Sequence, residues 1–390
     1  MRAGHVRPLW AGHPWVYAQA VERVEGGASP GDEVEVRDAR GNVLGRGYYS
    51  PGSAIPVRLL SRGAEPIDPG LVARRVEAAV AHRAELGLPS ADTSAYRVVH
   101  AEGDDLPGLV VDRYGDVLCV QLATLGMKLR EREIFDVLER ALRPRAIVDR
   151  TSPTAARLER FEPARGVVRG DESLQALEFR ERGFGFRVPL AIAQKTGHYL
   201  DQRELRARVE ALARGRRVLD VHCFTGSFSL AAARGGAMEV VAVDSSPAAI
   251  EVAAEQLGPN GLAGKVRFDC EDAHEALARA GRQGGFDLVL VDPPKLAPSR
   301  ASRDRAASVM RRLSEGACRA ARGGGLVVLS SCSAAVSMDL LVRSLALGAR
   351  EVGRRAVVLE RAFQGPDHPV PAAFPEGLYL SSVVARIEPP

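Results

Sequence analysis

The sequence predicts an α/β protein whose C-terminal part is a Rossmann-like domain with a seven-stranded, mainly parallel sheet. From residue 191 onward, short runs typical of buried strands alternate with helical patterns. Residues 217–230 (RVLDVHCFTGSFSL) predict a strand, a glycine turn and a helix, which together form the nucleotide-binding corner of a doubly wound sheet. The chain closes with two strands, 355–361 and 379–387, joined by a proline-rich loop.

Two smaller domains precede this one, and we expect the three domains at residues 1–65, 66–190 and 191–390. The first is a small β module, because glycine and proline turns separate its short alternating strands. The second is a compact α+β domain. Before residue 191 the expected strands are 33–37, 43–49, 55–60, 96–101, 108–112, 117–123, 146–149, 177–182 and 186–190, and the expected helices are 71–86 and 128–142.

The C-terminal domain is predicted as alternating strands and helices, which favours right-handed crossovers between parallel strands. Besides the closing pair, the expected strands are 218–222, 240–244, 265–270, 288–292 and 325–330. The expected helices are 226–235, 247–257, 273–281, 301–321 and 336–348.

The β module resembles the PUA domain, a small RNA-binding pseudobarrel. The resemblance is carried by residues 12–16 (GHPWV), 30–36 (PGDEVEV) and 45–50 (GRGYYS). It implies contact with RNA, and the alternative is a β cap that does not touch RNA.

Composition is that of a globular protein, with 46% apolar and 26% charged residues in 390. No apolar run reaches the roughly 18 residues that span a bilayer, and the N-terminus lacks a signal-peptide pattern, so we expect a cytoplasmic protein without membrane contact. The five cysteines show no paired or metal-ligand spacing, which predicts reduced thiols and no metal. The net charge of +4, with 49 arginines against four lysines, is compatible with RNA binding and equally with a genome-wide bias.

The predicted cofactor site begins at Gly226, where the backbone can approach a ligand closely. Asp244 ends the next buried strand and is placed to accept hydrogen bonds from ribose hydroxyls. The turn lacks the GxGxxG triplet that cradles a pyrophosphate, which disfavours a dinucleotide. A nucleoside without phosphates fits better, and S-adenosylmethionine is the candidate; the alternative is an ordinary glycine turn in an α/β core.

Two further strands end in polar groups at the same edge of the sheet. One runs into Asp292-Pro293-Pro294-Lys295, where the prolines stiffen the turn and present a flat surface to a planar base. The next runs into Cys332, which is placed beside Asp292 as a candidate nucleophile. The alternatives are a rigid loop end and a buried structural cysteine.

Residues 194–203 (QKTGHYLDQR) are dense in polar groups, and Asp201 or Gln202 is placed to bind the amino acid end of the cofactor. A capped, solvated helix start is the alternative. Asp272 is placed to accept from the adenine amino group, with helix capping as its alternative. A fourth polar group, at residues 100–105, is better explained as a solvated turn than as a metal site, because one histidine with flexible acids defines no coordination.

Together these motifs resemble the bacterial large-subunit ribosomal RNA cytosine-C5 methyltransferases that carry an N-terminal PUA domain. QKTGHYLDQR, FDLVLVDPPK and LSSCS follow one another in the family's order, and the resemblance covers nearly the whole chain. It implies a methyl transfer from S-adenosylmethionine to large-subunit ribosomal RNA. The resemblance implies cofactor contacts at Asp201, Gln202, Asp220, Phe224, Thr225, Gly226, Asp244, Ser245, Asp272 and Asp292, substrate contacts at Pro293, Pro294 and Lys295, and catalysis by Cys332 and Asp292.

One position departs from other RNA cytosine methyltransferases. Lys295 stands where many of them carry a second cysteine just after the prolines, so the group that removes the C5 proton is open, and Cys223 is not a convincing substitute. Two rival functions remain: an RNA methyltransferase acting on uracil C5 or a base nitrogen, and a non-catalytic RNA-binding or assembly factor. The sequence also leaves the oligomeric state open, with a homodimer as one alternative.

Overall fold

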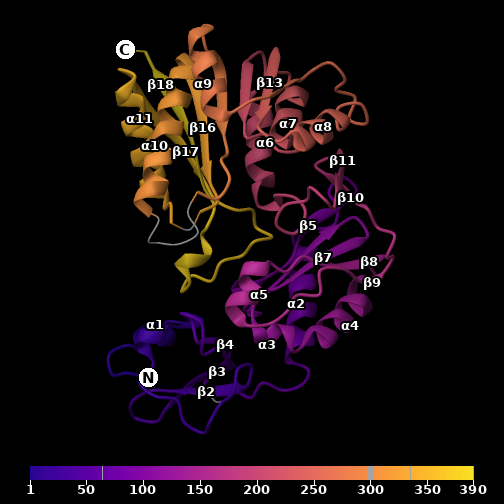
Figure 1. The fold of residues 1–390 in the computed structure, drawn as a ribbon, viewed down its shortest axis with the longest axis vertical. Coiled ribbons are helices and arrows are strands. Elements are labelled where there is room, and N and C mark those ends of the chain that lie inside the picture. Colours follow the sequence, from indigo (N-terminus) through magenta and orange to yellow (C-terminus); the bar gives the residue numbers. More distant parts are fainter. Residues whose placement is uncertain (64, 297–302, 334, 390) are drawn as a thin grey trace. The chain divides into compact units, whose positions relative to one another are not determined.

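The computed structural model describes residues 1–63, 65–296, 303–333 and 335–389 (Figure 1). By its internal contacts the chain divides into two compact units. The first unit comprises residues 1–184, 189–200 and 366–377, and the second comprises residues 185–188, 201–365 and 378–390. The division into three domains stays a prediction.

The first unit contains two sheets. A four-stranded antiparallel sheet has the order β1-β4-β3-β2, and a five-stranded sheet has the order β5-β6-β7-β8-β9, in which only β7 and β8 are parallel. The strands are β1 (Trp15–Val16), β2 (Glu33–Arg37), β3 (Val43–Tyr49), β4 (Val57–Arg62), β5 (Ala95–His100), β6 (Leu109–Tyr114), β7 (Val117–Leu122), β8 (Ala146–Asp149) and β9 (Gly166–Gly170). The helices are α1 (Arg7–Trp10), α2 (Leu71–Glu85), α3 (Leu125–Lys128), α4 (Glu131–Leu142) and α5 (Pro153–Glu159). The unit also contains β10 (Ala176–Glu181), whereas residues 185–188 of β11 (Phe184–Pro189) belong to the second unit.

The N-terminal β module shares its core with the rest of the first unit. Tyr48 and Leu60 are buried in one apolar cluster with Leu71 and Val98. Tyr48 packs so closely on Gly126 that a Cβ added there would lie 2.3 Å from its ring. Removing residues 1–65 would therefore expose the core that they cover, and point substitutions are the cleaner test of this module.

The sequence pattern missed α5 and β9, which lie in an arginine-rich segment without apolar periodicity. Glu159 anchors α5 instead, because its carboxylate is buried and accepts a 2.6 Å hydrogen bond from Ser50 Oγ. Arg58 lies 3.2 Å from the same carboxylate. Polar anchoring of this kind leaves no signal in a hydropathy pattern.

The second unit contains the seven-stranded sheet, in the order β14-β13-β12-β15-β16-β18-β17. The first five strands are parallel, and β18 runs antiparallel to both of its neighbours. This is the predicted fold, which is confirmed. The strands are β12 (Arg217–Val221), β13 (Glu239–Asp244), β14 (Arg267–Cys270), β15 (Phe286–Val291), β16 (Ala321–Ser331), β17 (Arg355–Ala362) and β18 (Ser381–Glu388).

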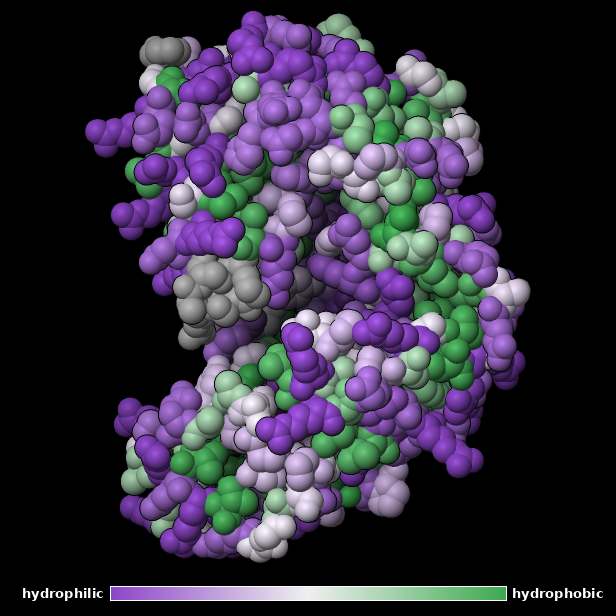
Figure 2. Space-filling view, viewed as in Figure 1, coloured by the Kyte–Doolittle hydropathy of each residue, from purple (hydrophilic) through white to green (hydrophobic). Residues whose placement is uncertain are grey.

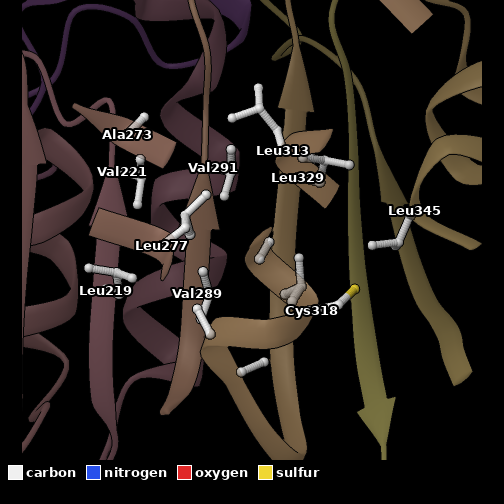
Figure 3. Close-up of a cluster of buried hydrophobic side chains, with 14 of the residues drawn as sticks. Leu219, Val221, Ala273, Leu277, Val289, Val291, Leu313, Cys318, Leu329 and Leu345 are labelled. Atoms are coloured by element: carbon white, nitrogen blue, oxygen red, sulfur yellow. The ribbon is translucent and has the colours of Figure 1, made fainter. Parts of the chain in front are cut away.

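The helices of the second unit are α6 (Arg203–Leu212), α7 (Ser227–Arg234), α8 (Pro247–Glu255), α9 (Ala273–Arg282), α10 (Arg303–Ala320) and α11 (Met338–Glu351). The predicted helix 301–321 begins at two residues that lie outside the described part of the chain. Alternate strand residues, such as Leu219, Val289 and Leu329, face α9, α10 and α11 in a continuous buried cluster (Figure 3). This packing fixes the carboxyl ends of the parallel strands, where the predicted site residues lie.

Polar residues cover most of the face shown in Figure 2. Within the described residues, every helix is too short or too polar to cross a membrane.

Candidate cofactor and catalytic site

The loop between β12 and α7 places three alternate residues in the left-handed backbone region. His222, Phe224 and Gly226 have φ values of +65°, +49° and +78°. Glycine is favoured at 226 by this φ, and a Cβ there would also lie tightly, at 3.2 Å from Ala253 and 3.3 Å from Leu230. For the two residues that do carry a Cβ, this conformation costs roughly 1–2 kcal/mol each. The sequence indicated the glycine but not the left-handed backbone of His222 and Phe224, because histidine and phenylalanine do not predict a positive φ.

Asp220 is fully buried at the end of β12. Its Oδ2 accepts a 2.6 Å hydrogen bond from Ser229 Oγ, and its Oδ1 is buried without a hydrogen-bond partner. Burial is the main cause that raises the pKa of Asp220 to about 7; the Ser229 hydrogen bond opposes it, and the carboxylates of Asp292 and Asp244 raise it further. The ionised form of such a buried carboxyl group is stabilised by a positive charge next to it.

Asp244 ends β13 and ties the loop to this strand. One carboxylate oxygen accepts from the backbone N–H of Phe224 at 3.0 Å, and the other accepts from Ser246 at 2.9 Å. Both oxygens keep lone pairs for a further donor. Ser245, predicted as a cofactor contact, is exposed in the following turn.

Asp272 is the N-cap of α9. Its Oδ1 accepts from the backbone N–H groups of His274, at 2.8 Å, and Glu275, at 3.3 Å. Capping, which was the alternative for this residue, is thus what the structure shows for Oδ1. Asp272 is exposed, and its contact with adenine stays a prediction.

Asp201 and Gln202 make different contacts. The Asp201 carboxylate accepts a 2.7 Å hydrogen bond from the Tyr379 hydroxyl, which the sequence pattern did not indicate. Gln202 Nε2 donates a 2.7 Å hydrogen bond to Asp292 Oδ2, while Gln202 Oε1 is buried without a partner. Gln202 therefore orients the carboxylate that follows β15.

Asp292 and Cys332 follow adjacent parallel strands at the same edge of the sheet, since β15 pairs with β16 up to Val291 and Leu329. Cys332 is partly exposed. Pro293 is buried, whereas Pro294 and Lys295 are exposed beside it.

The other cysteines differ from Cys332 in their surroundings. Burial raises the pKa of Cys119 well above its ordinary value and that of Cys318 to about 12. Cys223, in the cofactor loop, is buried, and burial raises the pKa of its thiol strongly. These thiols stay protonated, which supports leaving Cys223 out of the chemistry. Cys270 is exposed at the end of β14.

The GHPWV stretch packs inside the first unit. His13 Nε2 lies 3.2 Å from Glu376, and Tyr17 donates a 2.9 Å hydrogen bond to the same carboxylate. The Trp15 ring lies 4.6 Å from that of Phe374 in an edge-on arrangement. This stretch therefore holds residues 366–377, which join β17 to β18 in the chain, and its predicted RNA contact is not tested by these packing contacts.

A PUA-like domain model matches residues 1–62, and a model of S-adenosylmethionine-dependent methyltransferases matches residues 105–377. Ribosomal RNA large subunit methyltransferase I of Erwinia tasmaniensis is 35% identical over 387 residues, which cover 98% of each chain. The Escherichia coli protein of the same name is 33% identical over 388 residues, again 98% of each chain. The chain belongs to this family. It is an S-adenosylmethionine-dependent methyltransferase, which confirms the predicted fold and cofactor.

Two solved structures share the fold over almost the whole chain. An S-adenosylmethionine-dependent methyltransferase from Streptococcus mutans matches with a TM-score of 0.84 and 19% identity, covering 99% of this chain and 98% of the other. SMU.776, described as a methyltransferase and solved with SAH, matches with a TM-score of 0.86 and 19% identity, covering 98% and 97%.

The residues of the second unit fit the cofactor. Among the polar atoms there that are buried without a hydrogen-bond partner are Asp220 Oδ1, Thr225 Oγ1, Gln202 Oε1 and His222 Nε2. A nucleoside amino acid offers complementary groups, since its ammonium suits a carboxylate and its hydroxyls suit neutral donors and acceptors. Within the described residues, no group of histidine, cysteine and acidic side chains is arranged to hold a metal ion.

Proposed function

We propose that this enzyme methylates C5 of a cytosine in large-subunit ribosomal RNA through a covalent adduct with Cys332. The observation that carries the proposal is the partly exposed Cys332 directly after β16, beside β15, which Asp292 directly follows. The relatives from Erwinia tasmaniensis and Escherichia coli are named as large-subunit ribosomal RNA methyltransferases, and they support the RNA substrate.

A thiol is needed because C5 of cytosine alone is too weakly nucleophilic. In the proposed cycle the Cys332 thiolate forms a bond to C6, which places electron density on C5. S-adenosylmethionine supplies the electrophilic methyl group that C5 takes, and leaves as S-adenosylhomocysteine. The C5 proton then passes to a general base, the C5–C6 double bond forms again, and the S–C6 bond breaks to return the thiolate.

Asp292 is assigned to the N3–N4 edge of the cytosine. Its carboxylate is oriented by Gln202, so the hydrogen bond at 2.7 Å fixes it before the base arrives. The exposed Pro294 and Lys295 provide a flat surface and a cation next to the base. Reaching the target base requires it to leave the RNA stack.

The first unit is assigned to RNA binding, on the support of its PUA-like match and its arginine-rich composition. Phosphate contacts from arginines supply affinity, and shape recognition suits structured RNA. We place the enzyme in the cytoplasm, where such RNA is assembled into bacterial ribosomes.

The test combines Cys332→Ala with a trapped adduct. RNA containing 5-fluorocytosine should give a denaturation-resistant complex with the wild-type enzyme, because fluorine cannot leave as a proton does. Cys332→Ala should give neither adduct nor 5-methylcytosine while still binding S-adenosylhomocysteine; Cys270→Ser is the matched control and should retain both. A Cys332→Ala enzyme that methylates RNA at a substantial rate would favour transfer to a base nitrogen instead. Mapping 5-methyluridine in place of 5-methylcytosine would assign the uracil reaction, and absence of any methylation by the wild type would favour an assembly factor.

A further inference from the structure

The side chain of His222 has no assigned role, although it occupies a costly position in the cofactor loop. Its backbone is left-handed, with φ of +65°. At Gly226, two left-handed positions further on, the chain carries the residue that this backbone favours, and its surroundings are tight. At residue 222 the fold instead tolerates a strained histidine where glycine would be relaxed. A strained residue at a ligand-binding loop indicates that its side chain has a use.

The imidazole carries a polar atom that the protein itself does not satisfy. Nε2 of His222 is buried and has no hydrogen-bond partner, and burial is the main cause that lowers the pKa of the ring. The ring is therefore neutral near pH 7, and Nε2 can donate or accept according to its tautomer.

The side of the sheet toward which the loop turns follows from its backbone contacts, since Cys223, the next residue, donates a 3.0 Å hydrogen bond to the carbonyl of Val243 in β13. The titratable groups that act on the His222 ring are Asp244, Asp272 and His274, at the ends of β13 and β14 and the start of α9. In the sheet order β14-β13-β12-β15-β16 they lie on one side of β12, and Asp292 and Cys332 lie on the other. His222 thus belongs to the side of Asp244, which is assigned to the ribose, and away from the site of methyl transfer.

We propose that His222 binds the adenosine half of the cofactor, with Nε2 hydrogen-bonded to the nucleoside, and that it determines affinity for this half. Phe224 is not equivalent, since its backbone N–H is already held by Asp244 at 3.0 Å. The proposal rests on the S-adenosylmethionine cofactor and not on the identity of the methylated base.

The test measures binding and stability in the full-length protein. Calorimetry with S-adenosylhomocysteine and with 5′-methylthioadenosine, which lacks the amino acid part, separates the two halves of the ligand. His222→Gly should raise the melting temperature of the ligand-free protein, because it relieves the left-handed strain. It should also weaken the binding of both ligands by about the same factor, roughly tenfold. Arg143→Gly is the matched control: Arg143 is exposed in the first unit with φ of +46°, so glycine relieves strain there without changing either affinity.

Two further variants test whether Nε2 of His222 is the atom that binds the nucleoside. The amide of glutamine reaches about as far as Nε2, whereas that of asparagine reaches only as far as Nδ1. His222→Gln should therefore recover affinity for 5′-methylthioadenosine, and His222→Asn should not. The proposal is overturned if His222→Gly binds 5′-methylthioadenosine as tightly as the wild type, or if glutamine and asparagine behave alike. These binding measurements do not depend on which base is methylated. If cytosine C5 is not the target, the wild-type protein still binds S-adenosylhomocysteine, so failure of the proposed function is distinguishable from failure of the His222 proposal.

Discussion

The side-chain amide of Gln202 donates a 2.7 Å hydrogen bond from Nε2 to Oδ2 of Asp292. Gln202 is buried on the short 3-10 turn that precedes α6, whereas Asp292 follows β15, 90 residues further along the chain. An amide donor stabilises the ionised carboxylate and fixes its orientation. The motif QKTGHYLDQR thereby reaches the edge of the sheet where Asp292 lies, through a side chain that was predicted to bind the cofactor.

Replacing Gln202 with leucine should lower kcat about 10- to 100-fold, because Asp292 loses both orientation and a hydrogen bond worth roughly 1.5–3 kcal/mol to a charged group. The KM for S-adenosylmethionine should change less. Steady-state kinetics with varied S-adenosylmethionine checks both parameters.

Gln256→Leu is the matched control for this prediction. Gln256 is also a buried glutamine of the second unit, and its Nε2 donates to the carbonyls of Arg187 and Val252, both at 2.9 Å. Its replacement should lower the melting temperature without lowering kcat at temperatures where the protein stays folded. If Gln202→Leu gave only the same loss of stability, with an unchanged kcat, Gln202 would have a structural role alone.

Most strands of the sheets could be predicted from sequence, because dense apolar runs such as those at β8 and β15 leave few alternatives. The positions of Asp244, Asp292 and Cys332 at one edge of the sheet could also be predicted, since parallel strands deliver them to their carboxyl ends, while their roles stay predictions. Long-range polar contacts were not predictable. The Tyr379–Asp201 hydrogen bond joins residues 178 positions apart and has no local signature.

The five thiols should differ in reactivity. At neutral pH an alkylating reagent should modify the exposed Cys270 and the partly exposed Cys332, because the other three are buried with raised pKa values. Peptide mass spectrometry measures the modified fraction at each site. Bound RNA substrate should protect Cys332 and leave Cys270 reactive; equal protection of both would contradict a base-binding position for Cys332.

Trp10 is the most exposed aromatic side chain of the N-terminal module that the structure describes, at 65%. Aromatic rings at such positions stack on RNA bases, and each contact contributes roughly 1–3 kcal/mol. Trp10→Ala should weaken RNA binding about 10-fold or more in a filter-binding assay, with unchanged affinity for S-adenosylhomocysteine. Leu158→Ala, which removes an apolar side chain that is 64% exposed, should leave RNA affinity unchanged. Equal effects of the two substitutions would argue against stacking.

Asp220 links cofactor binding to stability through its raised pKa. Folding favours the protonated form, because burial raises the pKa from 3.8 to about 7. The favourable contribution is therefore complete below pH 3.8 and is lost progressively as the pH rises to about 7, where the buried carboxyl ionises. Asp220→Asn has no such dependence. It should stabilise the ligand-free protein more at pH 8 than at pH 5, which thermal melts at the two pH values measure.

The Asp220→Asn substitution should also weaken binding of the cofactor. At pH 8 the ammonium of S-adenosylhomocysteine is proposed to pair with the ionised Asp220, and asparagine removes this charge while keeping an oxygen that can accept from Ser229. Calorimetry should show a loss of about 10-fold or more. A variant that is stabilised at pH 8 and still binds like the wild type would locate the ammonium elsewhere. A variant that is not stabilised would mean that Asp220 already has a cation beside it in the ligand-free protein.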